Sequence, residues 1–272
     1  MRILVTHPGR HGDVLWSLPA IRALFEATHA QIDVATSPKY AGLVALIAAQ
    51  PYVHHAFAIP DWAIEESAPI TPREPPGLDA SDYDQVYHLG YKGWPLQPLP
   101  YEAFGLLLEQ TAHLQGLTLD LQRPWITVPL TGELDLSVVY GWSDEHFELK
   151  YGVTELVKYR LLTERGHVIH PLESRWAHEA PPFTPEGWGT SAQWIARTRV
   201  FLGCCSALHV LACALGIPCV IMEPAEARWN PIFWPFGKVG PQVTLVLGND
   251  GQPTFDARAV AHEIRRALAG GA

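Results

Sequence analysis

Short apolar runs typical of buried strands alternate along this chain with longer segments whose apolar residues recur every three or four positions. Residues 3–5 form such a run, and a loop containing Pro8, Gly9 and Gly12 follows it. A predicted helix comes next, with one apolar stripe of Val14, Leu15, Leu18, Ile21, Leu24 and Phe25. A strand at 32–35, a helix at 38–49 and a strand at 56–59 complete a βαβαβ order. This order predicts a parallel sheet covered by helices.

The same rhythm returns in the second half after a proline-rich stretch at 60–82. Between the halves we expect a strand at 84–89, a helix at 101–114 and an extended connection at 123–125. The later elements are expected at 136–140 (strand), 147–163 (helix), 168–169 (strand), 200–203 (strand), 207–215 (helix), 219–222 (strand), 243–247 (strand) and 256–268 (helix). Because 272 residues suffice for two domains, we predict an N-terminal domain at 1–130 and a C-terminal domain at 131–272.

Charge and hydropathy exclude several classes of protein. The formal net charge of −9 argues against a protein that coats nucleic acid or an anionic membrane. No apolar run reaches the roughly 18–20 residues that a membrane span needs, and the apolar start is too short for a signal peptide. We therefore expect a cytoplasmic protein with no nucleic-acid partner.

The four cysteines crowd into one segment, at Cys204, Cys205, Cys213 and Cys219. Two of them are adjacent, which is not the C-x-x-C spacing typical of a zinc site, and their neighbours are Leu, Val and Ala. The sequence therefore predicts small buried side chains in a reducing compartment, with no disulfide, no metal and no cofactor.

Asp13 lies where the first strand gives way to the first helix. Parallel sheets bind ligands at the carboxyl ends of their strands, so a carboxylate there could accept a proton from an incoming hydroxyl group. The alternative is that Asp13 only caps the helix, worth about 1 kcal/mol. Gly9 and Gly12 do not make a dinucleotide site, because "GRHGDV" lacks the G-x-G-x-x-G spacing.

In the second half, Ser206-Ala207-Leu208-His209 begins a helix directly after a strand. The free amides of a first helical turn favour an anion, so a phosphate could bind beside Cys205, Ser206 and His209. Lys150 could add a positive charge for a diphosphate. A buried core histidine and a solvated surface lysine are the alternatives for His209 and Lys150.

Two segments resemble the signatures of glycosyltransferase family 9, the ADP-heptose:lipopolysaccharide heptosyltransferases and their relatives. "GDVLWSLPAIRAL" (12–24) resembles the N-terminal signature, a strand-end Gly-Asp followed by a helix with Leu-Pro-Ala. "FLGCCSALHVLACALGIPCVIME" (201–223) is similar to the second, a strand, a turn, a histidine, then Ala-Leu-Gly and Pro. The resemblance implies a GT-B fold, an α/β architecture of two Rossmann-like domains with parallel sheets facing across a cleft.

The resemblance also implies an inverting, metal-independent transfer from a nucleotide-diphosphate sugar, as in lipopolysaccharide biosynthesis. It assigns Asp13 as the catalytic base. From its place in the same loop, His11 could orient the acceptor, with Gly12 between the two residues. For the donor the resemblance implies Lys150, the turn Cys204, Cys205 and Ser206, His209, and Arg228 in "EARWNPIFWP". The partners would be a nucleotide-sugar donor and a glycan or glycolipid acceptor, the latter reached by a transient contact at the inner membrane.

The donor turn departs from the family pattern, which carries an acid at Cys204, Ser or Thr at Cys205 and glycine at Ser206. A catalytically silent module that binds a glycan or a protein is therefore the first alternative function. A nucleotide-sugar epimerase is the second, although it needs paired acid and base groups for which only Asp13 with His11 or His209 can be named. The donor nucleotide, the sugar and the acceptor stay open.

Overall fold

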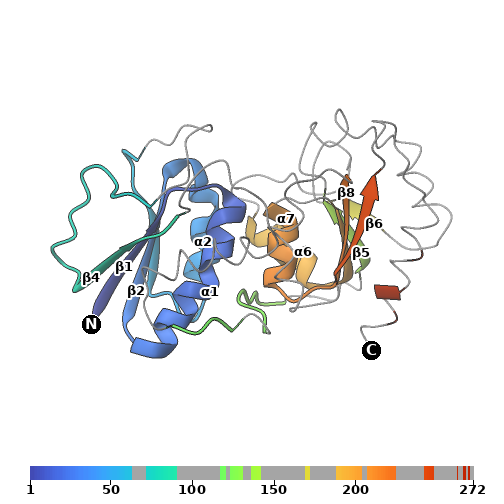
Figure 1. Ribbon diagram of the computed structural model, residues 1–272, viewed down its shortest axis with the longest axis horizontal. Coiled ribbons are helices and arrows are strands. Elements are labelled where there is room, and N and C mark those ends of the chain that lie inside the picture. The colour runs from blue at the N-terminus through green and yellow to red at the C-terminus, as the bar shows by residue number, and fades with distance from the viewer. Residues whose placement is uncertain are drawn as a thin grey trace. The chain divides into compact units, whose positions relative to one another are not determined.

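The computed structural model describes residues 1–62, 72–90, 117–120, 123–130, 136–141, 169–171, 188–203, 207–224 and 242–247, together with residues 262, 266, 267 and 269. The chain forms two compact units. Unit 1 holds Met1–Thr127 and Thr184–Gly189, and unit 2 holds Val128–Phe183 and Thr190–Ala272. Each unit is a layered α/β structure built on its own parallel sheet (Figure 1).

Unit 1 contains a four-stranded sheet in the order β3-β2-β1-β4, with every neighbouring pair parallel. Its elements in chain order are β1 (Arg2–His7), α1 (His11–Thr28), β2 (Gln31–Thr36), the 3-10 helix η1 (Pro38–Leu43), α2 (Val44–Ala48), β3 (His55–Ala58) and β4 (Gln85–His88). Figure 1 shows α1 and α2 on the same side of this sheet. The predicted βαβαβ order is thus confirmed for unit 1.

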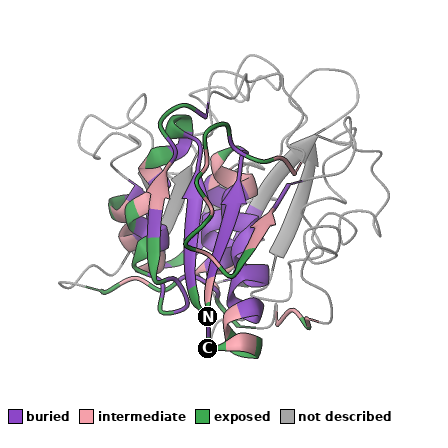
Figure 2. Cartoon of the chain, turned by 90° about the vertical axis from the view of Figure 1, so that its left-hand side faces the viewer, coloured by how far each residue is buried: buried purple, intermediate pink, exposed green. Residues whose placement is uncertain are grey.

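The alternating side chains of β1 and β2 bury both faces of this sheet. Leu4 and Ala35 pack with Ile59 and Trp62 on one face. The intervening apolar residues of β1 and β2 point to the other face, which α1 and α2 cover. Both strands are accordingly buried along nearly their whole length (Figure 2). Continuous apolar runs with helices on a face are what a parallel sheet needs, and this burial holds the carboxyl ends of the strands in fixed register.

The helix predicted at 38–49 is wrong as a single element. The chain forms a 3-10 helix first, with a non-helical Tyr40 (φ −113°, ψ 18°), and only then the five-residue α2. Pro38 fixes the start at the first helical position, and Gly42 lowers the local helix propensity. The segment is therefore too weak to form one regular α-helix.

The connection at 123–127 is fixed to unit 1 by hydrogen bonds that the sequence did not indicate. The indole N–H of Trp125 donates to the Leu15 carbonyl at 3.1 Å, and the ring lies 5.8 Å from that of Trp16. Gln50 pairs with Thr127 twice, donating from Nε2 to its carbonyl at 3.2 Å and accepting its N–H at 2.9 Å. This segment therefore belongs to the fold of unit 1 rather than to a loose linker.

Unit 2 contains a five-stranded parallel sheet in the order β6-β5-β7-β8-β9. Its elements are β5 (Leu136–Gly141), β6 (Ile169–Pro171), α6 (Trp188–Ala196), β7 (Thr198–Gly203), α7 (Ala207–Ala214), β8 (Cys219–Pro224) and β9 (Gln242–Leu247). Trp188 and Gly189, the first two residues of α6, belong to unit 1. Residues 262, 266, 267 and 269 are helical, inside or next to the predicted terminal helix. The helices predicted at 101–114 and 147–163 lie outside the described residues.

The helix α7 ends in a Schellman motif that turns the chain directly into β8. The N–H of Ile217 donates to the Ala212 carbonyl and the N–H of Gly216 to the Cys213 carbonyl, both at 3.0 Å. Gly216 adopts φ 74°, a left-handed conformation that a residue without Cβ takes at little cost. This tight turn sets Cys219, the first residue of β8, close to the C-terminal half of α7.

Candidate active site

The topology of unit 1 marks one place at the edge of its sheet for a ligand. The chain passes from β1 to β2 and β3 on one side, and β4 then pairs on the other side of β1. Ligands of open parallel sheets bind where the strand order reverses in this way, beyond the carboxyl ends of the two strands on either side of that point. In unit 1 this position lies after His7 at the end of β1 and after His88 at the end of β4.

The loop after β1 is held by the fully buried His7. Its Nδ1 accepts a hydrogen bond from the Gly9 N–H at 3.0 Å, which folds the chain back toward α1. Burial lowers the pKa of His7 to about 3, so the imidazole is neutral near pH 7. The loop therefore keeps its shape without a buried charge.

Asp13 is the third residue of α1 and lies in its first turn. The prediction that Asp13 occupies the cap position is wrong: the cap residue is Arg10, with extended backbone angles and no side-chain capping bond. The helix starts earlier than predicted: His11 and Gly12 are already helical, and the Val14 N–H donates to the Arg10 carbonyl at 2.9 Å. The half-buried Asp13 side chain thus lies in the first turn, at the positive end of the helix dipole.

His11 is packed between two aromatic rings at the start of α1. Its imidazole lies edge-on to Tyr40 at 5.0 Å and stacked on Trp188 at 4.8 Å, and residues 184–189 belong to the same unit. Burial lowers the pKa of His11 to about 4, and its Nε2 is buried with no hydrogen-bond partner among the described residues. His11 is therefore a neutral, rigidly held ring two residues from Asp13, and Gly12 separates them.

The structure adds polar groups at this edge that the sequence analysis did not identify. Thr6 Oγ1 lies 2.8 Å from Nδ1 of His88, which joins the ends of β1 and β4. The Ser37 hydroxyl, directly after β2, is buried with no partner among the described residues. The available signal was weak: Ser37 follows the strand predicted at 32–35, and His88 lies inside the strand predicted at 84–89.

In unit 2 the strand order reverses between β5 and β7, so the equivalent ligand position follows Gly203 at the end of β7. Of the residues predicted for the donor, only His209 is among the described ones. It is the third residue of α7 and its side chain is completely buried. Cys204, Cys205, Ser206, Lys150 and Arg228 lie outside the described residues, and their roles stay predictions.

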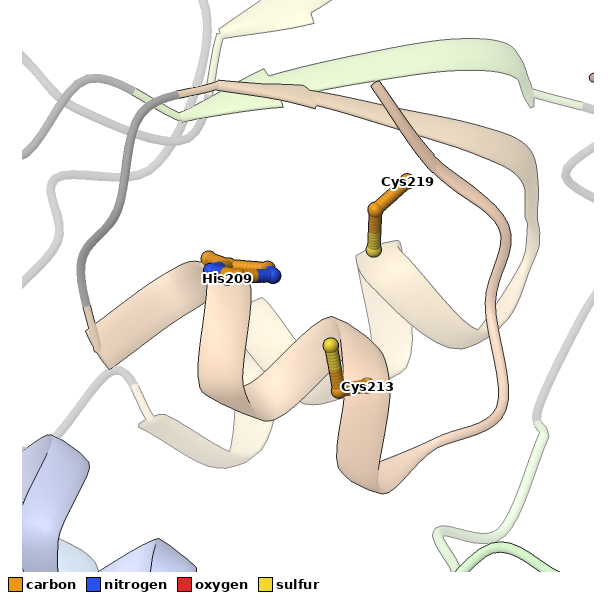
Figure 3. Close-up of side chains that lie close together, drawn as sticks. All are labelled: His209, Cys213 and Cys219. Atoms are coloured by element: carbon orange, nitrogen blue, oxygen red, sulfur yellow. The ribbon is translucent and has the colours of Figure 1, made fainter. Parts of the chain in front are cut away.

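The side chains of His209, Cys213 and Cys219 come together between α7 and β8 (Figure 3). Their nitrogen and sulfur atoms lie within 4.8 Å of one another, and all three residues are buried. Both sulfurs are thiols rather than partners in a disulfide. The sequence predicted buried cysteines but not this cluster, because the C-x-x-C pattern typical of zinc sites does not cover H-x-x-x-C followed by a cysteine after a turn.

The comparisons with known proteins show the fold alone. No family model and no curated protein sequence matches the chain. Among solved structures, Escherichia coli ADP-heptose lipopolysaccharide heptosyltransferase II is similar with a TM-score of 0.61 and 16% identity, over 99% of each chain. A glycosyltransferase of family 9 from Veillonella parvula has a TM-score of 0.64 and 11% identity, over 99% of this chain and 97% of that one.

A third similar structure is the dodecameric glycosyltransferase TibC of enterotoxigenic E. coli, described as iron-containing. Its TM-score is 0.59 at 15% identity, over 98% of this chain and 76% of that one. These similarities span nearly the whole chain and confirm the predicted fold, the GT-B architecture of glycosyltransferases.

Proposed function

We propose that this chain is a glycosyltransferase that moves a sugar from a nucleotide-diphosphate sugar to a hydroxyl group of a glycan or glycolipid. One observation carries the proposal: within a GT-B fold, Asp13 lies in the first helical turn beyond β1, where the strand order of unit 1 reverses. An ionised carboxylate at this position is suited to general-base catalysis.

The proposed reaction inverts the anomeric centre and needs no metal in the chemical step. The Asp13 carboxylate accepts the proton of the acceptor hydroxyl as its oxygen bonds to the anomeric carbon. The bond between that carbon and the phosphate oxygen breaks, and the nucleoside diphosphate leaves with the electron pair. Nδ1 of His7 accepts the Gly9 N–H and His11 is enclosed by aromatic rings, so we assign the proton to Asp13 rather than to either imidazole.

The donor is assigned to residues 131–272 and the acceptor to residues 1–130. The first turn of α7 follows β7, and helix N-termini with glycine- or serine-containing turns bind phosphates. Cys204, Cys205 and Ser206 form the proposed turn, His209 belongs to the same helix end, and Lys150 and Arg228 supply positive charge. The similar heptosyltransferase WaaC has been solved with ADP and with an ADP-heptose analogue, which supports a nucleotide-sugar donor here.

We place the protein in the cytoplasm, with access to the inner membrane where the acceptor is a glycolipid. Among the described residues, no helix has the length and apolar character of a membrane span. A glycolipid acceptor would be reached by a transient surface contact.

The test measures thermal shift and donor turnover with a panel of nucleotide sugars that includes ADP-heptose and GDP and UDP sugars. Asp13→Asn keeps the shape of the side chain and removes its basicity, and Asp61→Asn, an exposed acid of the same unit, is the matched control. We expect one donor to stabilise all three proteins, and turnover to fall by about 10²-fold or more only in Asp13→Asn. Undiminished turnover in Asp13→Asn would overturn the role of this residue.

A catalytically silent binding module is the second candidate function, favoured by the cysteine that stands at position 204 where the family carries an acid. The same experiment separates the two functions. A silent module gives no turnover with any donor, and its thermal stability is indifferent to Asp13→Asn.

A further inference from the structure

We propose that His209, Cys213 and Cys219 form a structural binding site for a thiophilic divalent cation, with Zn²⁺ as the expected ion, that links α7 to β8. The site lies inside unit 2, and one of its ligands, His209, belongs to the helix end named above for the donor. The ion itself is structural and takes no part in the chemical step proposed above. The proposal is carried by the convergence of one imidazole and two thiols in the described part of the chain (Figure 3).

The three ligands converge because of helical spacing and one tight turn. His209 and Cys213 are four residues apart on α7, so their side chains lie on the same face one turn apart. The Schellman motif around Gly216 then brings the chain back, and Cys219 opens β8 beside that face. Two ligands from a helix and one from the next strand are therefore held by the backbone itself.

The spacing of the ligand atoms is close to that of a tetrahedral zinc site. Zn–S bonds of about 2.3 Å and Zn–N bonds of about 2.0 Å place tetrahedral ligand atoms roughly 3.5–3.8 Å apart. The three atoms here already lie within 4.8 Å of one another. Shifts of less than about 1 Å would thus complete the geometry, and the fourth position stays open for water or another ligand.

The chemistry of the three groups favours a soft cation. Two thiolates neutralise a divalent ion, so the loaded site carries no net charge in its buried surroundings. Burial, together with the neighbouring Cys213, raises the pKa of the Cys219 thiol well above its usual value. Metal binding must therefore displace thiol protons, and its affinity should increase with pH.

The test uses the full chain, purified under reducing conditions, stripped with a chelator and titrated with Co²⁺ as a spectroscopic probe for Zn²⁺. We expect one Co²⁺ per chain, with a thiolate-to-cobalt charge-transfer band and the intense visible bands of tetrahedral cobalt, both abolished by Zn²⁺. Zn²⁺, but not Mg²⁺, should also raise the unfolding temperature, because a ligand that binds only the folded state stabilises it.

Variants identify the ligands. Cys213→Ala and Cys219→Ala should each lose the charge-transfer band, whereas Cys204→Ser with Cys205→Ser should keep it. Circular dichroism of the metal-free proteins verifies that each variant is folded. The proposal is overturned if the folded wild type gives no cobalt bands, if the bands survive in Cys213→Ala, or if thiol titration finds Cys213 and Cys219 oxidised to a disulfide. None of these readouts needs a donor or an acceptor, so they succeed or fail independently of the proposed activity.

Discussion

At the scale of single residues, the buried imidazoles of unit 1 link its stability to pH. His7 is fully buried and has a pKa lowered to about 3, and His11 has a pKa lowered to about 4. In the unfolded chain both groups take up a proton near pH 6.5. Between these values the unfolded state binds more protons than the folded state, so stability is present above about pH 6.5 and is lost as the pH falls.

We therefore predict that the free energy of unfolding decreases by about 1 kcal/mol per pH unit for His7 alone below pH 6.5. His7→Asn keeps an acceptor near the position of Nδ1 but cannot be protonated, so its stability should depend less on pH. Urea unfolding from pH 7 to pH 5 measures the difference, with the exposed His55→Asn as control. Parallel stability curves for wild type and His7→Asn would contradict this assignment.

Asp33 is the second residue whose role is set by burial. Its carboxylate is nearly inaccessible and lies 3.3 Å from Arg2 Nη2, 2.8 Å from His54 Nδ1 and 2.9 Å from the Tyr83 hydroxyl, which donates to it. Asp33→Ala should destabilise the protein by roughly 2–3 kcal/mol, because its three partners lose their buried acceptor. The loss is not larger because the side chains of Arg2 and His54 can still form hydrogen bonds with water. Denaturant unfolding against Asp61→Ala measures the cost, and equal losses in the two variants would refute it.

The sequence predicted the strand that carries Asp33 but gave no reason for an acid inside it. Strand prediction depends on neighbouring residues, whereas the partners of this carboxylate come from positions 2, 54 and 83. The same limit applies to the position of Asp13 in its helix. That Asp13 follows the first strand was predictable, but the start of α1 at His11 depends on the His7–Gly9 hydrogen bond that shapes the loop.

At the scale of elements, the connection at 123–127 depends on Trp125. Its buried ring packs beside Trp16, and its N–H donates to the Leu15 carbonyl of α1. The sequence predicted only an extended connection here, because the residues that fix it belong to α1 and to the segment after α2.

Two substitutions at Trp125 separate the hydrogen bond from the packing. Trp125→Phe should cost about 1–3 kcal/mol, since it removes the donor to Leu15 and part of the ring. Trp125→Ala should cost about 3–5 kcal/mol, because it also leaves a cavity between α1 and the connection. Equilibrium unfolding measures both, and an exposed Arg123→Ala is the control, whose salt bridges with Glu26 and Asp120 should be worth little. A Trp125→Ala protein as stable as Arg123→Ala would show that this connection is not part of the core.

At the scale of the whole molecule, local periodicity was enough to predict two parallel-sheet halves, and the solved structures confirm that fold. Periodicity did not predict how the chain is shared between the halves. It passes from one unit to the other after residues 127, 183 and 189, so unit 1 regains a short segment late in the sequence. The helix α6 begins at Trp188, and the buried Trp188 side chain packs with unit 1.

This returning segment should control the protonation of His11. Trp188 lies 4.8 Å from its imidazole and contributes to the burial that lowers the His11 pKa to about 4. Trp188→Ala should admit water to the ring, so the His11 pKa should rise toward 6.5, and the protein should lose about 3–5 kcal/mol of stability through the lost packing. Trp188→Phe keeps an aromatic face and should leave the pKa nearer to its wild-type value. An NMR titration of the histidine ring protons, assigned with His11→Asn, measures these pKa values. An unchanged His11 pKa in Trp188→Ala would mean that Tyr40 and the loop after β1 exclude water without help from the distant segment.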